Sequence, residues 1–146
     1  MSSLNQLEKI RASQFETVQN GRLRDTHARL ERLRVLYQAL KKWEPQLLKA
    51  LKEDLGKSHT EGYMTEIGVV YGEIRELMHH LPKWNRPRKA AAGVASFPSR
   101  GVRIPEPIGM ALIFSPWNYP VQLTLSPLAA GLAAGCPCGV EPSRDS

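Results

Sequence analysis

One asparagine lies where its amide could take part in a reaction. Asn118 belongs to residues 114–120 (FSPWNYP), between an apolar run and a stretch with helix composition. A strand-to-helix turn of this kind is where α/β proteins bind ligands. The asparagine amide is uncharged, so at any physiological pH it can donate to an oxygen that becomes negative when a carbonyl is attacked. Pro116 and Pro120 restrict the backbone on either side of this donor.

A structural role for Asn118 is the alternative. Asparagine is a good helix cap, and in this interpretation Trp117 and Tyr119 are core aromatic residues of the same turn. Composition and spacing alone leave both interpretations open.

Cysteine and histidine, which often carry catalysis or bind metals, are few. The cysteines are Cys136 and Cys138, separated by one proline. They exclude a disulfide framework, and two thiols cannot complete a tetrahedral metal site. The 4 histidines fall in helical or inter-helix segments, and we interpret them as surface residues. We therefore expect no metal site.

The basic character of the chain raises the question of an acidic partner. The 146 residues carry a net charge of +6, which allows nucleic acid as a ligand without requiring it. Most basic residues are mixed with acidic ones, as on a solvated helix surface. The dense basic run is residues 84–89 (WNRPRK), preceded by Lys83. We expect no nucleic-acid partner, and binding of an acidic polymer through residues 83–89 is the alternative.

Two stretches bear on targeting and membrane insertion. The first residues, MSSLNQLEKIRASQ, carry charges early and have no apolar core of signal-peptide length, so we expect a cytoplasmic protein. The weakly charged residues 104–140 are interrupted by Pro116, Asn118, Pro120 and Pro127, so we expect no membrane-spanning segment.

Helical periodicity dominates the first two thirds of the chain. Apolar side chains recur at the spacing of one helical face: Leu30, Leu33, Tyr37 and Leu40. They predict an amphipathic helix over residues 24–43. Because proline fits the first turn of a helix better than its interior, we predict a kink or a short break at residues 44–45, and then helix up to Gly56.

Further helices and a boundary follow from the same kind of pattern. Residues 64–81 form another apolar helical face that ends near Pro82, and residues 4–19 are a weaker candidate helix. After the basic run the chain becomes small and nearly neutral and then turn-forming. We therefore place a boundary between a helical region, residues 1–97, and a second region, residues 98–146.

The second region predicts the order strand, turn, helix. Residues 102–105 and 110–114 have strand composition, and the latter run is apolar throughout, as in a strand buried on both faces of a parallel sheet. A helix fits residues 121–134, with Pro120 at its start and Gly135 at its end. This order is half of a βαβ unit, so the predicted fold class is α/β.

The segment from Glu106 to Gly135 resembles the aldehyde dehydrogenase superfamily. The matching residues are Pro107, Gly109, PWNYP at 116–120, Pro127 and AAG at 133–135. Upstream, DLGK at 54–57, EGYMTEI at 61–67 and KW at 83–84 are similar to the branch that includes the class 3 and fatty aldehyde enzymes, as is QLTLSP at 122–127. The resemblance covers nearly the whole chain from about residue 23 onward.

The resemblance implies a helical hairpin followed by the first strand, turn and helix of an incomplete Rossmann-like cofactor domain. It also implies oxidation of an aldehyde substrate to a carboxylic acid with NAD or NADP. In this family a cysteine thiolate attacks the aldehyde, an asparagine amide holds the oxyanion, hydride passes to the nicotinamide, and a glutamate activates water. By its position in PWN, Asn118 matches the oxyanion donor. Phe114, Ser115, Pro116 and Trp117 match the strand end that lies along the cofactor.

The match weakens after the predicted helix. The family continues with a strand and a Lys-Pro-Ser-Glu motif whose lysine contacts the adenosine ribose or its phosphate. Here Glu141 takes the lysine position, and Pro137 and Gly139 disfavour the strand. A carboxylate can accept hydrogen bonds from ribose hydroxyls but repels a 2′-phosphate. The family's nucleophilic cysteine and glutamate base lie downstream of these residues, so we interpret Cys136 and Cys138 as structural.

The resemblance therefore implies that the chain is the N-terminal portion of an NAD(P)-dependent aldehyde dehydrogenase that is a homodimer at full length. The isolated chain is expected to be inactive, because one oxyanion donor without a nucleophile provides no covalent route. It is also expected to expose apolar surface. The alternative is a non-catalytic basic helical interaction module.

Overall fold

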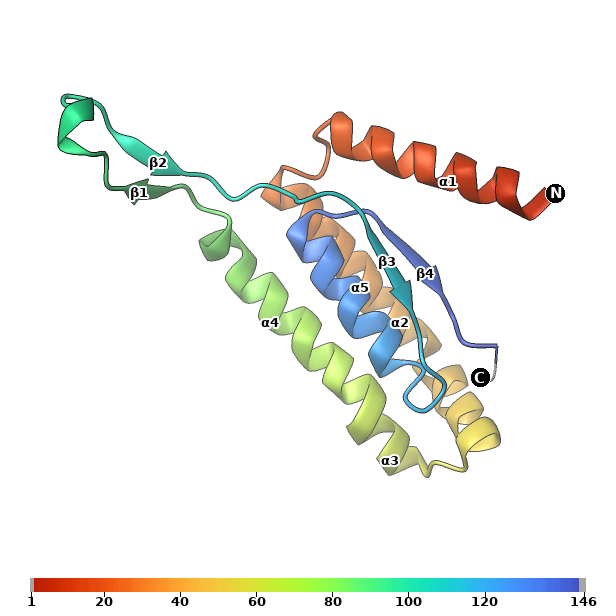
Figure 1. The fold of residues 1–146 in the computed structure, drawn as a ribbon. Coiled ribbons are helices and arrows are strands. Elements are labelled where there is room, and N and C mark those ends of the chain that lie inside the picture. The colour runs from red at the N-terminus through yellow and green to blue at the C-terminus, as the bar shows by residue number, and fades with distance from the viewer. Residues whose placement is uncertain (1, 145–146) are drawn as a thin grey trace.

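The computed structural model describes residues 2–144, with side chains from residue 5 onward. It consists of a helical bundle, a small parallel sheet and a projecting hairpin (Figure 1). The helices are α1 (Ser2–Gln19), α2 (Thr26–Leu55), α3 (His59–Gly62), α4 (Gly68–Trp84) and α5 (Gln122–Ala134), and the π-helical turn η1 (Tyr63–Ile67) joins α3 to α4. The strands are β1 (Arg88–Ala90), β2 (Gly101–Arg103), β3 (Ala111–Phe114) and β4 (Cys138–Glu141), and η2 (Val94–Ser96) is a 3-10 turn.

Helix α2 has a cap at each end and a proline inside. The Asp25 carboxylate accepts hydrogen bonds from the backbone N–H groups of His27 and Ala28, each at 3.2 Å. Gly56 closes the other end in the left-handed conformation, with φ 67°. Of the two alternatives predicted at Pro45, the break does not occur, because apolar side chains on both sides of it are buried in one core.

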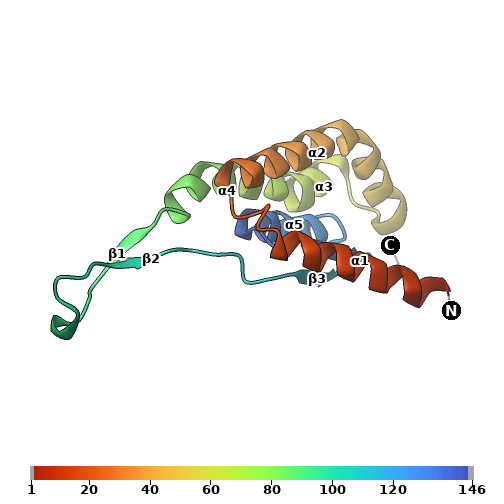
Figure 2. The same cartoon turned by 90° about the horizontal axis from the view of Figure 1, so that it is seen from above.

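The core lies where α2, α4 and α5 meet. These three helices lie side by side in both views (Figures 1 and 2), and α5 packs against the other two. The fully buried residues there include Leu33 from α2, Val70 and Ile74 from α4, and Ala129 from α5. The predicted apolar faces of α2 and α4 are thus confirmed, and α5 covers them.

Helix α1 runs past the sheet and does not join the bundle (Figure 2). Its formation confirms the weaker helix predicted at residues 4–19. Its side chains Leu7, Ile10 and Phe15 are 59%, 47% and 55% exposed, so it leaves apolar surface uncovered. Within the described part of the chain, no helix is both long enough and apolar enough to cross a bilayer.

Strands β3 and β4 form a parallel pair. Ala111 lies opposite Cys138 and Phe114 opposite Glu141. A strand therefore forms at β4, although Pro137 and Gly139 were expected to disfavour it. Pro137 lies just before the strand, where its carbonyl oxygen accepts from the Ala111 N–H at 3.0 Å, and residue 139 pairs through its backbone, which needs no side chain.

The strand-turn-helix order predicted for residues 110–134 is confirmed by β3 and α5, but the burial of β3 differs from the prediction. Ile113 is buried, whereas Leu112 and Phe114 are 63% and 72% exposed. Within residues 2–144 only one face of this strand is covered, the face toward α5. The burial of β3 on both faces, which its apolar composition predicts, is therefore not observed within residues 2–144.

The hairpin of β1 and β2 projects from the end of α4 (Figure 1). The strands pair antiparallel, with Arg88 opposite Arg103. Strand β2 confirms the position of the strand predicted at residues 102–105, whereas β1 was not predicted. The predicted boundary after residue 97 falls between the two strands, and the division there stays a prediction. Binding of an acidic polymer through residues 83–89 stays the alternative.

A buried arginine ties three helix ends together. Arg29, in the first turn of α2, is 3% exposed. Its guanidinium donates to the carbonyl oxygens of Leu23 at 2.5 Å and Ala133 at 3.4 Å, and to Oδ1 of Asn85 at 3.3 Å. Asn85 follows α4 and Ala133 lies in the last turn of α5. One side chain therefore joins the start of α2 to the ends of the other two helices.

The substitution Arg29→Met is expected to destabilise the fold, because it keeps much of the apolar stem but leaves buried acceptors without their donor. We expect the free energy of unfolding, measured by urea denaturation and circular dichroism, to fall by about 2–4 kcal/mol. Arg32→Met, at an exposed position on the same helix, is the matched control and is expected to change it by less than about 0.5 kcal/mol. Equal effects of the two substitutions would contradict the role of Arg29.

Candidate active site

The turn between β3 and α5 is held at its base by backbone and hydroxyl groups. The Ser115 N–H donates to the carbonyl oxygen of Glu141 at 3.0 Å and so extends the parallel ladder by one bond. The Ser115 hydroxyl lies 2.6 Å from Oγ1 of Thr124, and the Thr124 hydroxyl donates to the carbonyl oxygen of Pro120. These contacts join the start of the turn to the first turn of α5.

Asn118 lies in this turn and is exposed. Its Oδ1 accepts a hydrogen bond from the Tyr119 N–H at 3.1 Å, and within residues 2–144 its Nδ2 has no acceptor. Helix α5 has no cap from its own turn. The alternative in which Asn118 caps this helix was therefore wrong, and Trp117 and Tyr119, 57% and 39% exposed, are not core residues.

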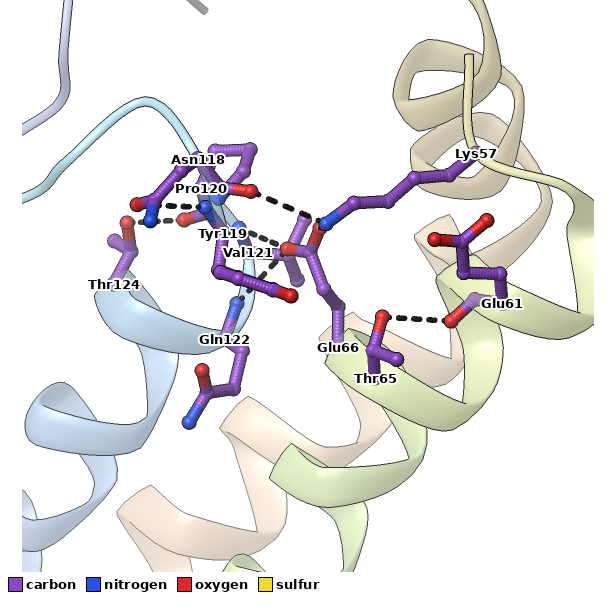
Figure 3. A network of polar contacts seen from close by, with 10 residues as sticks. All are labelled: Lys57, Glu61, Thr65, Glu66, Asn118, Tyr119, Pro120, Val121, Gln122 and Thr124. Atoms are coloured by element: carbon purple, nitrogen blue, oxygen red, sulfur yellow. Dashed lines mark hydrogen bonds and ion pairs between the residues drawn. The ribbon is translucent and has the colours of Figure 1, made fainter. Parts of the chain in front are cut away.

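The helix cap comes instead from a buried ion pair (Figure 3). Glu66 in η1 is fully buried, and its Oε1 lies 2.5 Å from Nζ of Lys57, which follows α2 and is 9% exposed. Oε2 of Glu66 accepts from the N–H groups of Val121 at 2.8 Å and Gln122 at 3.3 Å. These amides at the helix start have no partner within α5, and the helix dipole favours a negative charge there.

Lys57 also reaches the turn directly. Its Nζ donates to the carbonyl oxygen of Asn118 at 3.2 Å and lies 3.9 Å from the centre of the Tyr119 ring. Such a distance allows a cation–π interaction. The pair of Lys57 and Glu66 therefore contacts the residues from 118 to 122 on both sides of the point where turn becomes helix.

Neither charged residue was predicted to belong to a site, although both lie in segments that carry the resemblance. A signal was present in the sequence, because Glu66 directly precedes Ile67 and lies four residues before Val70, and a carboxylate among apolar side chains needs a partner. Its exact direction depends on the π-helical turn η1, which periodicity does not predict. Gly68 permits that turn, since a Cβ there would lie 2.9 Å from the carbonyl oxygen of Tyr63.

The residues matched to the cofactor lie around one end of the sheet. Phe114 and Glu141 are register partners at the carboxyl ends of β3 and β4, and Ser115, Pro116 and Trp117 continue from that end. Phe114 is 72% exposed, and Glu141 is exposed as well. The structure thus brings these five positions together at the edge where α/β proteins bind ligands. Their contact with a cofactor stays a prediction.

Comparison with known proteins identifies the family. Residues 5–146 match the model of the aldehyde dehydrogenase family. The chain belongs to the aldehyde dehydrogenase family. Its fold is that of the N-terminal portion of such an enzyme, because it aligns with a solved aldehyde dehydrogenase of Staphylococcus aureus in a substrate-bound state. That alignment has a TM-score of 0.88 and 33% identity, and covers 94% of this chain and 30% of the other.

Similar curated proteins include members of family 3. The chain is 37% identical over 121 residues to a 4,4′-diaponeurosporen-aldehyde dehydrogenase of Staphylococcus aureus, covering 83% of this chain and 26% of the relative. It is 34% identical over 139 residues to aldehyde dehydrogenase family 3 member A2 of Rattus norvegicus, covering 95% of this chain and 28% of the relative. The chain therefore spans about a quarter of the length of these relatives.

The cysteines of this aldehyde dehydrogenase segment lie away from Asn118. Cys138 pairs with Ala111 at the first register position of β3 and β4, opposite to the end that carries Phe114. Cys136 is 4% exposed, and the Cys138 thiol donates to its carbonyl oxygen at 3.3 Å. Burial, together with the nearby Cys136, raises the pKa of Cys138. In the part that the structure describes, no three His, Cys, Asp or Glu side chains are placed to hold a metal ion.

Cys138 is expected to react slowly with iodoacetamide at neutral pH. A raised pKa leaves less thiolate, which is the reacting form, and the fraction of thiolate increases as the pH rises. Timed alkylation of the native chain, followed by peptide mass spectrometry, should show a rate below that of free cysteine at pH 7 and an increase toward alkaline pH. Urea should bring the rate up to that of free cysteine. Labelling of the native chain as fast as free cysteine would contradict this.

Proposed function

We propose that this segment supplies the oxyanion donor and one wall of the cofactor site to an NAD(P)⁺-dependent aldehyde dehydrogenase. The observation that carries the proposal is the Nδ2 group of Asn118, which is exposed and has no acceptor within residues 2–144, in the turn that follows a parallel strand. An amide in this place can stabilise the charge that develops on a carbonyl oxygen under attack. The relatives, all named as aldehyde dehydrogenases, support the same reaction.

The role of each residue follows from its place. Asn118 donates to the oxyanion, and its neutrality keeps the donor available across the pH range. Phe114 and Trp117 expose apolar side chains, and Ser115 and Pro116 lie between them. Such an edge, mainly apolar with a polar group, suits the binding of a dinucleotide. NAD(P)⁺ would accept the hydride there. The resemblance places the nucleophilic thiolate and the base that activates water downstream of these residues, so the 146 residues alone are not expected to turn over an aldehyde.

The substrate, assembly and compartment are part of the same proposal. The substrate is an aldehyde that becomes a carboxylic acid, and the full-length enzyme is a cytoplasmic homodimer. Support for an assembly comes from the hairpin, where Val94 and Phe97 are 95% and 87% exposed. Apolar side chains gathered on a projecting element are typical of an interaction surface.

Asn118→Ala is expected to lower kcat by about 10²–10³-fold in the protein encoded by the complete reading frame, because it removes the proposed oxyanion donor. NADH formation from an aliphatic aldehyde, followed by absorbance, measures the effect. The change in the free energy of unfolding should stay below about 0.5 kcal/mol, since the side chain is exposed. Asn20→Ala, at another exposed asparagine, is the control. An Asn118→Ala enzyme with the kcat of the Asn20→Ala enzyme would refute the proposed role.

Glu141→Lys is expected to shift the cofactor preference toward NADP⁺. Glu141 lies at the carboxyl end of β4 and is exposed, and a carboxylate there repels a 2′-phosphate that an ammonium group attracts. The ratio of kcat/KM for NADP⁺ to that for NAD⁺ should rise by about tenfold. Glu106→Lys, which makes the same charge change outside the strands, should leave the ratio unchanged. A ratio that responds equally to both substitutions would exclude a local contact at Glu141.

A further inference from the structure

The buried charged residues of the described chain divide into two kinds. Arg29, Lys57 and Glu66 are the charged side chains buried there. Arg29 donates to carbonyl groups at helix ends, which is a structural task. Lys57 and Glu66 bind each other, and their other polar contacts all go to residues 118–122. The pair is thus directed at the turn that carries Asn118.

Stability alone does not explain a buried ion pair. Removing two charges from water is costly, and well-packed apolar residues of similar volume often stabilise a core equally well or better. Apolar residues cannot, however, bind a chosen carbonyl oxygen or a chosen N–H group. The buried pair makes hydrogen bonds of fixed direction to chosen backbone atoms of the turn, and so it can hold those atoms in place.

We infer that Lys57 and Glu66 are positioning residues that set the orientation of the Asn118 amide; this rests on the proposed function of Asn118. Glu66 anchors the amides of Val121 and Gln122, so the helix side of the turn is fixed. Lys57 holds the carbonyl oxygen of Asn118, so the backbone of Asn118 itself is fixed as well.

The contacts continue from the backbone to the amide itself. Nζ of Lys57 lies against the ring of Tyr119, and the Tyr119 N–H binds Oδ1 of Asn118 (Figure 3). With Oδ1 held in this way, Nδ2 is left as the free donor within residues 2–144. An oxyanion donor acts through pre-organisation, and a displacement of about 1 Å is enough to lower a rate by roughly a hundredfold.

The double variant Lys57→Met/Glu66→Gln tests the inference in the protein encoded by the complete reading frame. It replaces the pair by neutral side chains of similar length. The glutamine oxygen can still accept from the start of α5, but the methionine cannot donate to Asn118. Hydrogen exchange measured by mass spectrometry should be about tenfold faster in peptides covering residues 115–123, and unchanged in α2. The kcat should fall by about tenfold or more, while KM changes less than about twofold.

Three further variants separate positioning from loss of structure. Glu31→Gln/Arg34→Met makes the same chemical change at an exposed ion pair of α2 and should alter neither exchange at residues 115–123 nor kcat. Arg29→Met lowers stability from the other end of α5 and should leave residues 115–123 as in the wild type. Lys57→Arg keeps the charge and the donor and should retain more of the kcat than the double variant.

The inference is overturned if exchange at residues 115–123 in the double variant equals that of the wild type. It is also overturned if kcat falls no further than in Arg29→Met. An inactive wild-type enzyme would instead remove the proposed function, and a role of the pair in catalysis with it. Exchange at residues 115–123 would then still show whether the pair holds the turn, so the two failures are distinguishable.

Discussion

The start of α5 depends on a carboxylate that belongs to another helix. The sequence of α5 has no acidic residue in its first turn and no side-chain cap, so its first amides would be buried donors without a partner. Glu66 supplies the acceptor from η1, and Lys57 balances the charge that this burial requires. This one interaction therefore fixes the start of α5 and, with it, the turn before it.

Several backbone features can be understood from the same constraint. Gly56 ends α2 in a left-handed conformation, and the next residue, Lys57, points into the bundle instead of continuing the helix. The π-helical turn η1 places Glu66 opposite the start of α5, and Gly68 leaves room for that turn. Features that are unusual for a helix thus lie next to the candidate site, as is common for π-helical turns. Arg29 performs the corresponding structural task at the far end of α5 without such features.

Local pattern was sufficient for the parts of the fold whose formation is local. The apolar face around Leu33 predicts α2, and the order of apolar run, Pro120 and Gly135 predicts β3 and α5. The family motif further placed Asn118 in the right turn. Features that local pattern left open or did not predict depend on contacts distant in sequence. Of the kink and the break predicted at Pro45, the break is excluded because both halves of α2 bury side chains in one core.

The remaining errors have the same origin. Strand β4 forms despite unfavourable composition because β3 offers it a ladder, and β1 exists because β2 pairs with it. The cap on α5 was missed for a related reason, since Glu66 and Val121 are joined by a bond between residues 55 positions apart. Short-range patterns do not indicate that these two residues meet. They show only that a carboxylate lies among apolar side chains and needs a partner.

At the carboxyl end of the sheet, strand pairing does not depend on the side chain that the proposed chemistry uses. In the turn, the fold and the proposed chemistry depend on the same contacts. Glu141 enters the ladder through its backbone, and its carbonyl accepts from the Ser115 N–H whatever its side chain is. A charge reversal there can alter the electrostatics of the strand end without disturbing β4. Asn118 differs, because its carbonyl, its amide oxygen and the helix after it are all held by contacts that start at the buried pair. If the proposed function holds, single surface substitutions at this strand end can change the cofactor preference, whereas the direction of the Asn118 amide is tied to the packing of α5 on α2 and α4.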